Sequence, residues 1–343
     1  MTTRFPAEWE EQDGVLLAWP HSESDWRNDL DLVEPVFTEI ARQVSRFEAV
    51  LITAPDPDTV RGKLADAGAF MERVRLFRID GNDTWARDFG PITVLENGKP
   101  LLLDFVFNGW GLKFAADKDN LINRRLSEAG AFNAPLRTKG LVMEGGSIES
   151  DGSGTILTTA RCLLSPNRNP HLSRPDIEAE LAKLLGTDRF FWLEQGHLAG
   201  DDTDSHIDTL ARLCPDDTII HIACSDTLDE HFQAIGNMVA ELGGLRTRAG
   251  SPYRLIPLPW PGARFDSDGL RLPATYANFL VINGAVLVPT YDDPDDEAAL
   301  RAVGSAFQGR EIIGVDCLPL LLQHGSLHCV TMQLPKGTIS LTS

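Results

Sequence analysis

The feature that most constrains the fold is a hairpin pattern that recurs along the chain. Asn-Gly pairs at 97–98 and 283–284 each separate two apolar runs, and this arrangement is the strongest short-range hairpin signal. Two further hairpins are indicated, with turns near Gly152 and Asp216. The four turns are 55, 64 and 67 residues apart. The sequence therefore predicts one supersecondary unit that is repeated along the chain.

Helical patterns lie between the hairpins, in residues 121–131, 174–186, 228–244 and 296–309. Before the first hairpin, apolar runs at 15–20 and 50–55 flank a helical stretch at 33–47. A repeat in the mid-sixties allows about five units in 343 residues. We therefore expect an α/β fold of one domain over residues 1–343, built from strand–helix units around a centre. A doubly wound sheet is the competing fold, but no GxGxxG follows a predicted strand, and tight hairpins join antiparallel neighbours.

The charge of the chain disfavours nucleic acid as a partner. The sequence has 31 Lys+Arg against 50 Asp+Glu, a formal charge of −19, and no basic run. Because nucleic-acid binding depends on basic side chains that neutralise phosphates, a cationic partner is expected instead. No apolar stretch approaches the roughly 20 residues that cross a bilayer, and the first residues contain no apolar signal segment. We expect a cytoplasmic protein that does not bind membranes, with a homo-oligomer left open.

The cysteines argue against a disulfide framework. There are five, without CxxC spacing, which also argues against a thiolate metal site. Cys162, Cys214, Cys224 and Cys317 lie in or beside apolar runs and fit inert packing. Cys329 differs, because it lies between a Gly-containing loop and a predicted strand.

Four segments contain more polar, glycine and aromatic residues than the framework of the fold requires. They are residues 82–91, 143–147, 200–212 and 324–329. In the first, Asp88 precedes Phe-Gly-Pro, and taken alone it is more typical of a turn than of a site.

In the third segment, carboxylates crowd around one histidine: Asp201, Asp202, Asp204 and Asp208 surround His206. Such crowding requires a cation, which is a metal, the imidazolium, Arg212 or a ligand. A solvated acidic loop is the plain alternative.

In the fourth segment, Cys329 has His324 and His328 nearby, and a nearby imidazolium lowers the pKa of a thiol. A cysteine, a histidine and carboxylates from separate loops predict thiol chemistry on a cationic substrate.

At these residues the sequence resembles the agmatine deiminase branch of the guanidino-group modifying enzymes, a superfamily that also includes peptidylarginine deiminases and arginine deiminase. The matching stretches run in order over nearly the whole chain. They are NDTWARDFGP at 82–91, FNGWG at 107–111, LVMEGGSIESDGSGTILTT at 141–159, LLSPNRNP at 163–170, HIDTLAR at 206–212, NGAVLVPTYDD at 283–293 and GSLHCVTMQLP at 325–335. The resemblance implies a five-bladed α/β propeller, the pentein fold, which agrees with the repeat.

The resemblance also implies roles for particular residues. Cys329 is the expected nucleophile, His206 the general acid/base, and Asp88 and Asp208 the carboxylates that hold the guanidinium. Three further positions, Trp85, Glu144 and Asp202, are expected to bind substrate. No metal and no cofactor are expected.

The chain departs from the family at two places. In the loop that ends at the expected nucleophile, family members commonly have GGGNIHC, where this chain has Gln323-His324-Gly325-Ser326-Leu327-His328-Cys329. They also tend to carry Glu four positions before the catalytic histidine, where this chain has Asp202, one methylene shorter. That acidic residue is expected to receive the substrate's distal amine.

The expected reaction is hydrolysis of agmatine to N-carbamoylputrescine and ammonia, on a route to putrescine. Peptidyl-arginine or another guanidine is the alternative substrate, and an amidinotransferase is a rival reaction. From other classes, a non-catalytic propeller that binds partners and a metallohydrolase at the acidic cluster remain open.

Overall fold

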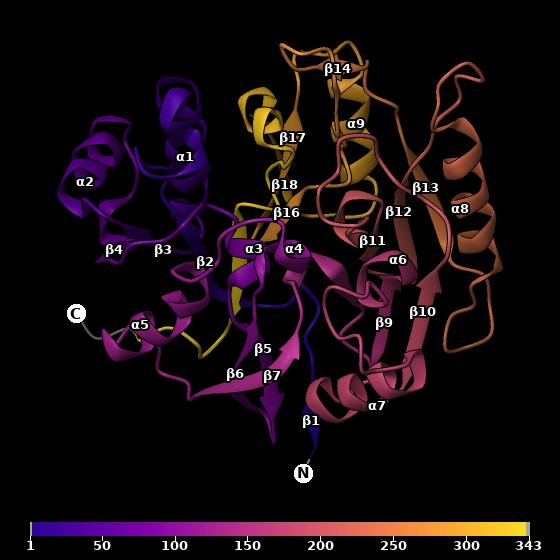
Figure 1. Ribbon diagram of the computed structural model, residues 1–343, viewed down its shortest axis with the longest axis horizontal. Helices are drawn as coiled ribbons and strands as arrows, with labels where there is room; N and C mark the ends of the chain where they lie inside the picture. Colours follow the sequence, from indigo (N-terminus) through magenta and orange to yellow (C-terminus); the bar gives the residue numbers. More distant parts are fainter. Residues whose placement is uncertain (1, 341–343) are drawn as a thin grey trace.

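The computed structural model describes residues 2–340 and shows a mixed α/β fold. In this part of the chain the strands form five sheets of three or four strands and one two-stranded ribbon, and none of these sheets closes on itself. Figure 1 shows the sheets spread around a central region that contains the short helices α3 (Ala86–Phe89) and α4 (Gly109–Leu112), with the longer helices farther out.

The sheets are made of the following strands, given in the order of hydrogen-bonded neighbours: β19 (Thr331–Pro335), β2 (Gln12–Ala18), β3 (Ala49–Ala54) and β4 (Val74–Arg78); β1 (Thr3–Arg4), β5 (Ile92–Glu96), β6 (Lys99–Val106) and β7 (Leu136–Val142); β10 (Arg189–Leu193), β9 (Thr155–Thr159) and β8 (Ile148–Ser150); β11 (Ala211–Cys214), β12 (Thr218–Ile222) and β13 (Arg254–Leu258); β16 (Leu280–Ile282), β17 (Ala285–Thr290) and β18 (Glu311–Asp316). The ribbon pairs β14 (Arg264–Phe265) with β15 (Arg271–Leu272).

The five sheets share one connectivity. Two strands pair antiparallel, and the second of them pairs parallel with a strand that follows a helix. In one unit β8 and β9 are antiparallel, α7 (Arg174–Leu185) follows β9, and β10 pairs parallel with β9. A tight turn joins only antiparallel strands, whereas a parallel neighbour needs a longer crossover, usually a helix. This connectivity confirms the predicted strand–helix units and excludes the doubly wound alternative.

The four predicted turns all connect antiparallel strands. Between β5 and β6, Asn97 and Gly98 have φ of 52° and 77°. A two-residue hairpin turn requires positive φ at both central positions, and Asn and Gly adopt it most readily. Asp216 and Asp217, with φ of 57° and 52°, do the same between β11 and β12. The hairpin prediction is confirmed because its turn chemistry is local.

The remaining helices are α1 (Leu30–Ser45), α2 (Pro57–Asp66), α5 (Ile122–Glu128), α6 (Ala160–Leu163), α8 (Phe232–Gly244) and α9 (Asp296–Gly304). Short 3₁₀ turns add η1 (Asp25–Asn28), η2 (Met71–Arg73), η3 (Asp119–Leu121), η4 (Gly145–Ser147), η5 (Ile207–Thr209) and η6 (Leu318–Gln323).

Helix ends follow their capping residues. At the start of α7, Ser173 and Asp176 form a capping box, and at its end Gly186 is left-handed with φ of 70°. The helix predicted from residue 228 instead begins at Phe232, because Asp229 folds into a turn and accepts the backbone N–H of His231. The sequence analysis did not predict α2, which begins with Pro57.

The last strand of the chain completes the sheet that contains one of the first. β19 pairs antiparallel with β2, and β2 pairs parallel with β3. This pairing places the segment just before β19, where Cys329 lies, beside the N-terminal part of the chain. Over residues 2–340, helices of the length and apolarity that a bilayer crossing needs are not found.

Candidate functional site

A cavity of about 140 Å³ opens among the loops at the central region, and it contains a thiol, aromatic rings and acids. Its lining comes from segments that are far apart in the sequence: Asp25, Asp83, Trp85, Asp88, Trp110, Phe114, Asp201, Asp202, Thr203, Thr209, Gln323, His324, Gly325 and Cys329. Of the seven residues expected at the site, Cys329, Asp88, Trp85 and Asp202 line this cavity. The other three, His206, Asp208 and Glu144, are buried behind it.

Cys329 lies directly before β19 and is 6% exposed. Its Sγ donates to Oδ1 of Asn278 over 3.3 Å, and its backbone N–H donates to the same oxygen over 3.2 Å. Burial raises the pKa of the thiol well above its ordinary value, and the carboxylates of Asp208 and Asp88 raise it further. In this structure the thiol is therefore neutral at physiological pH.

The two histidines near the thiol hydrogen-bond to other groups. Nδ1 of His328 contacts Oδ2 of Asp208 at 2.7 Å, and Nδ1 of His324 contacts the carbonyl oxygen of Gly200 at 2.7 Å. The expected lowering of the Cys329 pKa is outweighed by burial and by the carboxylates, which raise it.

Asp88 lies in α3 and is held by two donors. Nε1 of Trp110 donates to its Oδ2 over 2.9 Å, and the backbone N–H of Gly146 donates to its Oδ1 over 3.1 Å. Burial raises the pKa of Asp88 to about 6, partly offset by the positive charge of His206. Asp88 is a fixed carboxylate that titrates close to neutral pH.

Gly146 brings three candidate groups together. A Cβ at this position would lie 2.6 Å from Nδ1 of His206 and 3.0 Å from both Oδ2 of Asp208 and Oδ1 of Asp88. The first distance is shorter than real Cβ contacts and the other two are tight, so the absence of a Cβ lets the imidazole and the two carboxylates converge. The structure thus brings Asp88, His206 and Asp208 around one point, as the sequence predicted.

His206 lies just before η5 and is 1% exposed. Its Nδ1 is 3.6 Å from Oδ1 of Asp88, and its Nε2 is 3.8 Å from Oε2 of Glu144. Burial alone would lower the pKa of His206, but the negative charge of Asp88 and the side chains of Cys162 and Glu144 outweigh it and raise the pKa well above the ordinary value. The imidazole is therefore held as a cation.

Asp208, in η5, is fully buried. Burial disfavours its charged form, but the hydrogen bond from His328 and the charges around it lower its pKa below the ordinary value. Its Oδ2 accepts from His328, and among the described residues its Oδ1 has no hydrogen-bond partner. Oδ2 of Asp208 is therefore held by His328, and Oδ1 is available to accept a hydrogen bond.

Glu144 lies behind His206. Both of its oxygens accept from Nε of Arg168, at 3.0 and 2.8 Å, and the two side chains are 0% exposed. The thiol of Cys162 lies 3.9 Å from the same carboxylate. Burial opposes ionisation of Glu144, but the nearby imidazole of His206 and the charge of Arg168 lower its pKa. Glu144 therefore supports the imidazolium from the side away from the cavity.

Several cations compensate the acidic segment 200–212. Arg212 pairs directly with Glu8 and Glu149, and its charge also lowers the pKa of Asp208. Arg168 and Lys113 both bind Asp204, at 2.6 and 2.9 Å. Asp204 thus has a structural role at the start of the site.

Trp85, which is buried, and Asp202, which is partly exposed at the mouth, both line the cavity. Trp85 packs against Trp26, and a Cβ at Gly325 would lie 2.1 Å from the Trp85 ring, so this glycine lets the loop before Cys329 approach the indole. Burial raises the pKa of Asp202 above its ordinary value. Asp83, also at the mouth, has its pKa raised to about 7 by burial and then by the charge of Asp25.

Three residues of the site were not predicted from the sequence. Asn278 holds the thiol, Trp110 fixes Asp88, and Arg168 neutralises Glu144. Trp110 and Arg168 lie in the quoted FNGWG and LLSPNRNP stretches, so a signal existed for them, whereas Asn278 gave none because its function depends on tertiary contact.

Two buried groups have the residue types of metal ligands. One is Glu144, Cys162 and His206, and the other is Glu8, Glu149 and His328; within each group the ligand atoms lie within 4.8 Å of one another. Arginines are paired with the carboxylates of both groups. This pairing supplies positive charge and fits an ion-pair network better than a metal centre.

Comparison with known proteins identifies the family. The model of the Porphyromonas-type peptidyl-arginine deiminase matches residues 4–335. The chain is 32% identical to an agmatine deiminase of Pseudomonas aeruginosa, over 97% of this chain and 95% of the relative.

Two solved structures are close in fold. A provisionally named arginine deiminase from Porphyromonas gingivalis is 50% identical, with a TM-score of 0.94 over 98% of this chain and 100% of that one. A Cys-to-Ser variant of the agmatine deiminase from C. jejuni, with substrate bound, is 40% identical, with a TM-score of 0.91 over 98% and 97% of the two chains. On this match in both sequence and structure, the chain belongs to the family of Porphyromonas-type peptidyl-arginine deiminases and agmatine deiminases.

Proposed function

We propose that the protein hydrolyses the guanidinium group of agmatine to give N-carbamoylputrescine and ammonia, a step toward putrescine. One observation carries the proposal: Asp88, His206 and Asp208 converge around Gly146 beside the thiol of Cys329. Relatives that are named agmatine deiminases support the choice of reaction.

The two carboxylates bind the guanidinium. Asp88 and the free Oδ1 of Asp208 accept N–H donors from the planar cation and hold its central carbon near the sulfur of Cys329. Trp85 and Trp110 form apolar walls for the substrate's stem. The carboxylates of Asp88 and Asp208 raise the pKa of the Cys329 thiol. The bound cation offsets their charge and favours ionisation, so the substrate helps to activate the thiol.

The chemistry then has two steps. As the guanidinium binds, the thiol of Cys329 loses its proton to solvent. The thiolate attacks the central carbon and a C–S bond forms; a C–N bond breaks while the His206 imidazolium protonates the departing nitrogen, which leaves as ammonia. Neutral His206 next takes a proton from water, whose oxygen attacks the carbon. The C–S bond breaks, and the sulfur recovers its proton as the ureido product leaves.

Cys329, rather than Cys162, is the nucleophile in this proposal. Cys329 lines the cavity, whereas Cys162 is 0% exposed and lies on the Glu144 side of His206. A thiolate acts as a nucleophile only where the substrate can reach it.

The far end of the cavity favours an amine. Asp25, Asp83 and Asp202 surround the mouth, and their charge attracts an ammonium group and repels a carboxylate. Agmatine carries an ammonium there, whereas free arginine adds a carboxylate. A peptidyl-arginine substrate is the second candidate, because the matching family model describes that activity.

The proposal includes the wider setting of the enzyme. The five repeated sheets support a five-bladed α/β propeller that acts as one catalytic domain over 1–343. The five free thiols fit a reducing, cytoplasmic location. We propose no nucleic-acid or membrane partner and leave a homo-oligomer as an open expectation.

The test is a colorimetric assay for ureido product with agmatine, free arginine and an arginyl peptide. We expect turnover on agmatine that exceeds the other two and is unchanged by EDTA. Preference for the peptide would instead assign peptidyl-arginine deimination, and loss of activity with EDTA would favour a metallohydrolase. An added amine that captures the amidino group would indicate an amidinotransferase, and no turnover on any guanidine would favour a non-catalytic binding protein.

A further inference from the structure

One imidazole links a carboxylate of the site to a carboxylate of the N-terminal segment. Nδ1 of His328 lies 2.7 Å from Oδ2 of Asp208, and Nε2 of the same ring lies 2.7 Å from Oε2 of Glu8. The three side chains are 2%, 1% and 9% exposed, respectively. Both ring nitrogens donate to these carboxylates only when the ring carries two protons. The arrangement is a closed relay from Glu8 to Asp208.

Glu8 is itself fixed. Its Oε1 accepts the backbone N–H of Val281 over 2.7 Å, and its Oε2 accepts from Nη2 of Arg212 over 2.9 Å. The pKa of Glu8 lies below its ordinary value, since the charges of His328 and Arg212 outweigh burial. Glu8 therefore remains a charged, immobile anchor for the imidazole.

The relay determines which oxygen of Asp208 meets the substrate. With Oδ2 held by His328, Oδ1 is the oxygen left without a partner in the described part of the chain. If the relay is broken, the carboxylate can rotate about its last bond, and both guanidinium binding and approach to the sulfur suffer.

We propose that Glu8 is a positioning residue for guanidine hydrolysis, which through His328 fixes the carboxylate of Asp208 in its substrate-binding orientation. This inference rests on the proposed function. It assigns a part in substrate binding to a residue that lies outside the substrate cavity, in the segment between β1 and β2.

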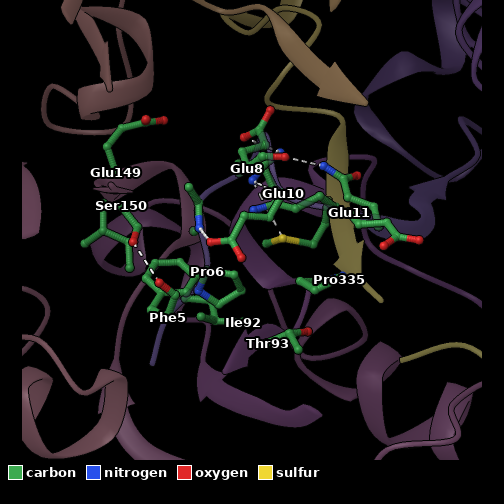
Figure 2. Close-up of a pocket in the computed structure, with 17 residues that line it drawn as sticks. Phe5, Pro6, Glu8, Glu10, Glu11, Ile92, Thr93, Glu149, Ser150 and Pro335 are labelled. Atoms are coloured by element: carbon green, nitrogen blue, oxygen red, sulfur yellow. Dashed lines mark hydrogen bonds and ion pairs between the residues drawn. The ribbon is translucent and has the colours of Figure 1, made fainter. Parts of the chain in front are cut away.

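Figure 2 shows the pocket that this N-terminal segment borders, with Glu8, Glu10 and Glu11 labelled. The pocket has a volume of about 30 Å³ and is separate from the substrate cavity. Glu10 supplies a matched control, because it stabilises the same segment without touching His328. It pairs with Arg4 and accepts the backbone N–H of Ala7 over 2.8 Å.

The experiment compares steady-state kinetics on agmatine for the wild type, Glu8→Gln, Glu10→Gln, His328→Gln and the Glu8→Gln/His328→Gln double variant. Circular dichroism checks folding of each protein. For Glu8→Gln we expect a fall in kcat/KM of about tenfold or more, with KM raised as well as kcat lowered. Glu10→Gln should keep the wild-type KM and kcat. The double variant should be no worse than the more impaired single variant, because both changes break one link.

A purely structural role gives a different pattern. A smaller folded fraction lowers the apparent kcat and leaves KM unchanged. That result would overturn the inference while the proposed function stands. Wild-type KM and kcat in Glu8→Gln would do the same, and so would losses of kcat/KM that multiply in the double variant. If Glu8→Gln does not fold, His328→Gln removes the same link from the other end and decides by the same KM criterion. A wild type that is inactive on every guanidine overturns both proposals.

Discussion

His206 and Asp88 stabilise each other's charged forms: Nδ1 of the imidazole lies 3.6 Å from Oδ1 of the carboxylate. Burial disfavours both charges, so neither group would stay ionised as readily by itself. In the proposed mechanism, the pair keeps a proton donor for the leaving nitrogen next to an acceptor for the guanidinium. Protonation of Asp88 would therefore remove a substrate contact and also a partner of His206.

The first prediction concerns pH. In the proposed mechanism Asp88 binds substrate as a carboxylate, and its pKa is about 6, so kcat/KM on agmatine should fall about tenfold per unit below that pH. Because a bound guanidinium favours the carboxylate, the matching limb in kcat should lie at lower pH. A pH series of initial rates measures both limbs. An acid limb in kcat/KM at the ordinary aspartate value would contradict the assignment.

The second prediction separates the two thiols near His206. Cys329→Ser should lower kcat by about a thousandfold or more, because it removes the nucleophile. Cys162→Ser should keep kcat within a few fold and affect mainly thermal stability, since this thiol is buried away from the cavity. Rates on agmatine and melting temperatures of the two variants show which thiol is the nucleophile. The reverse pattern would make Cys162 the nucleophile.

The third prediction tests the convergence at Gly146. Gly146→Ala places a methyl 2.6 Å from Nδ1 of His206 and forces the three groups apart, so kcat/KM should fall about a hundredfold. Gly140→Ala is the matched control, because a Cβ there meets nothing within 4 Å. It should behave as the wild type. Equal activity in both variants would show that the groups need not meet at this point.

The fourth prediction concerns Asp202 and the distal amine. Asp202→Asn should raise KM for agmatine by about three- to tenfold while kcat changes little. Butylguanidine, which has the same stem without the ammonium, should show the same KM with both proteins. If the two substrates respond alike, Asp202 does not receive the amine.

Local signals predicted most of the fold. The hairpin turns at Asn97-Gly98 and near Asp216 depend on backbone conformations that a few residues specify, and they were placed correctly. The start of α8 was misplaced, because contacts of Asp229 with Trp260 and Arg271, distant in sequence, stabilise the preceding turn. Sequence periodicity does not register such contacts.

The site was predictable to the extent that its residues lie in motifs. Asp88, His206 and Cys329 could be named, but their electrostatics could not. His328 seemed to belong to the thiol by adjacency, yet its ring turns to Asp208 and Glu8. Adjacency in the sequence did not identify the partners of His328, because the carboxylates that contact its ring come from distant parts of the chain.

The pairing of β19 with β2 has a consequence for how the enzyme matures during translation. Cys329, the proposed nucleophile, lies two residues before the strand that completes this sheet, and its partner strand is made some 300 residues earlier. A ribosome must therefore have synthesised the chain through β19 before the thiol can reach its acids. Incomplete nascent chains should be unable to consume guanidines, however well their earlier hairpins have formed.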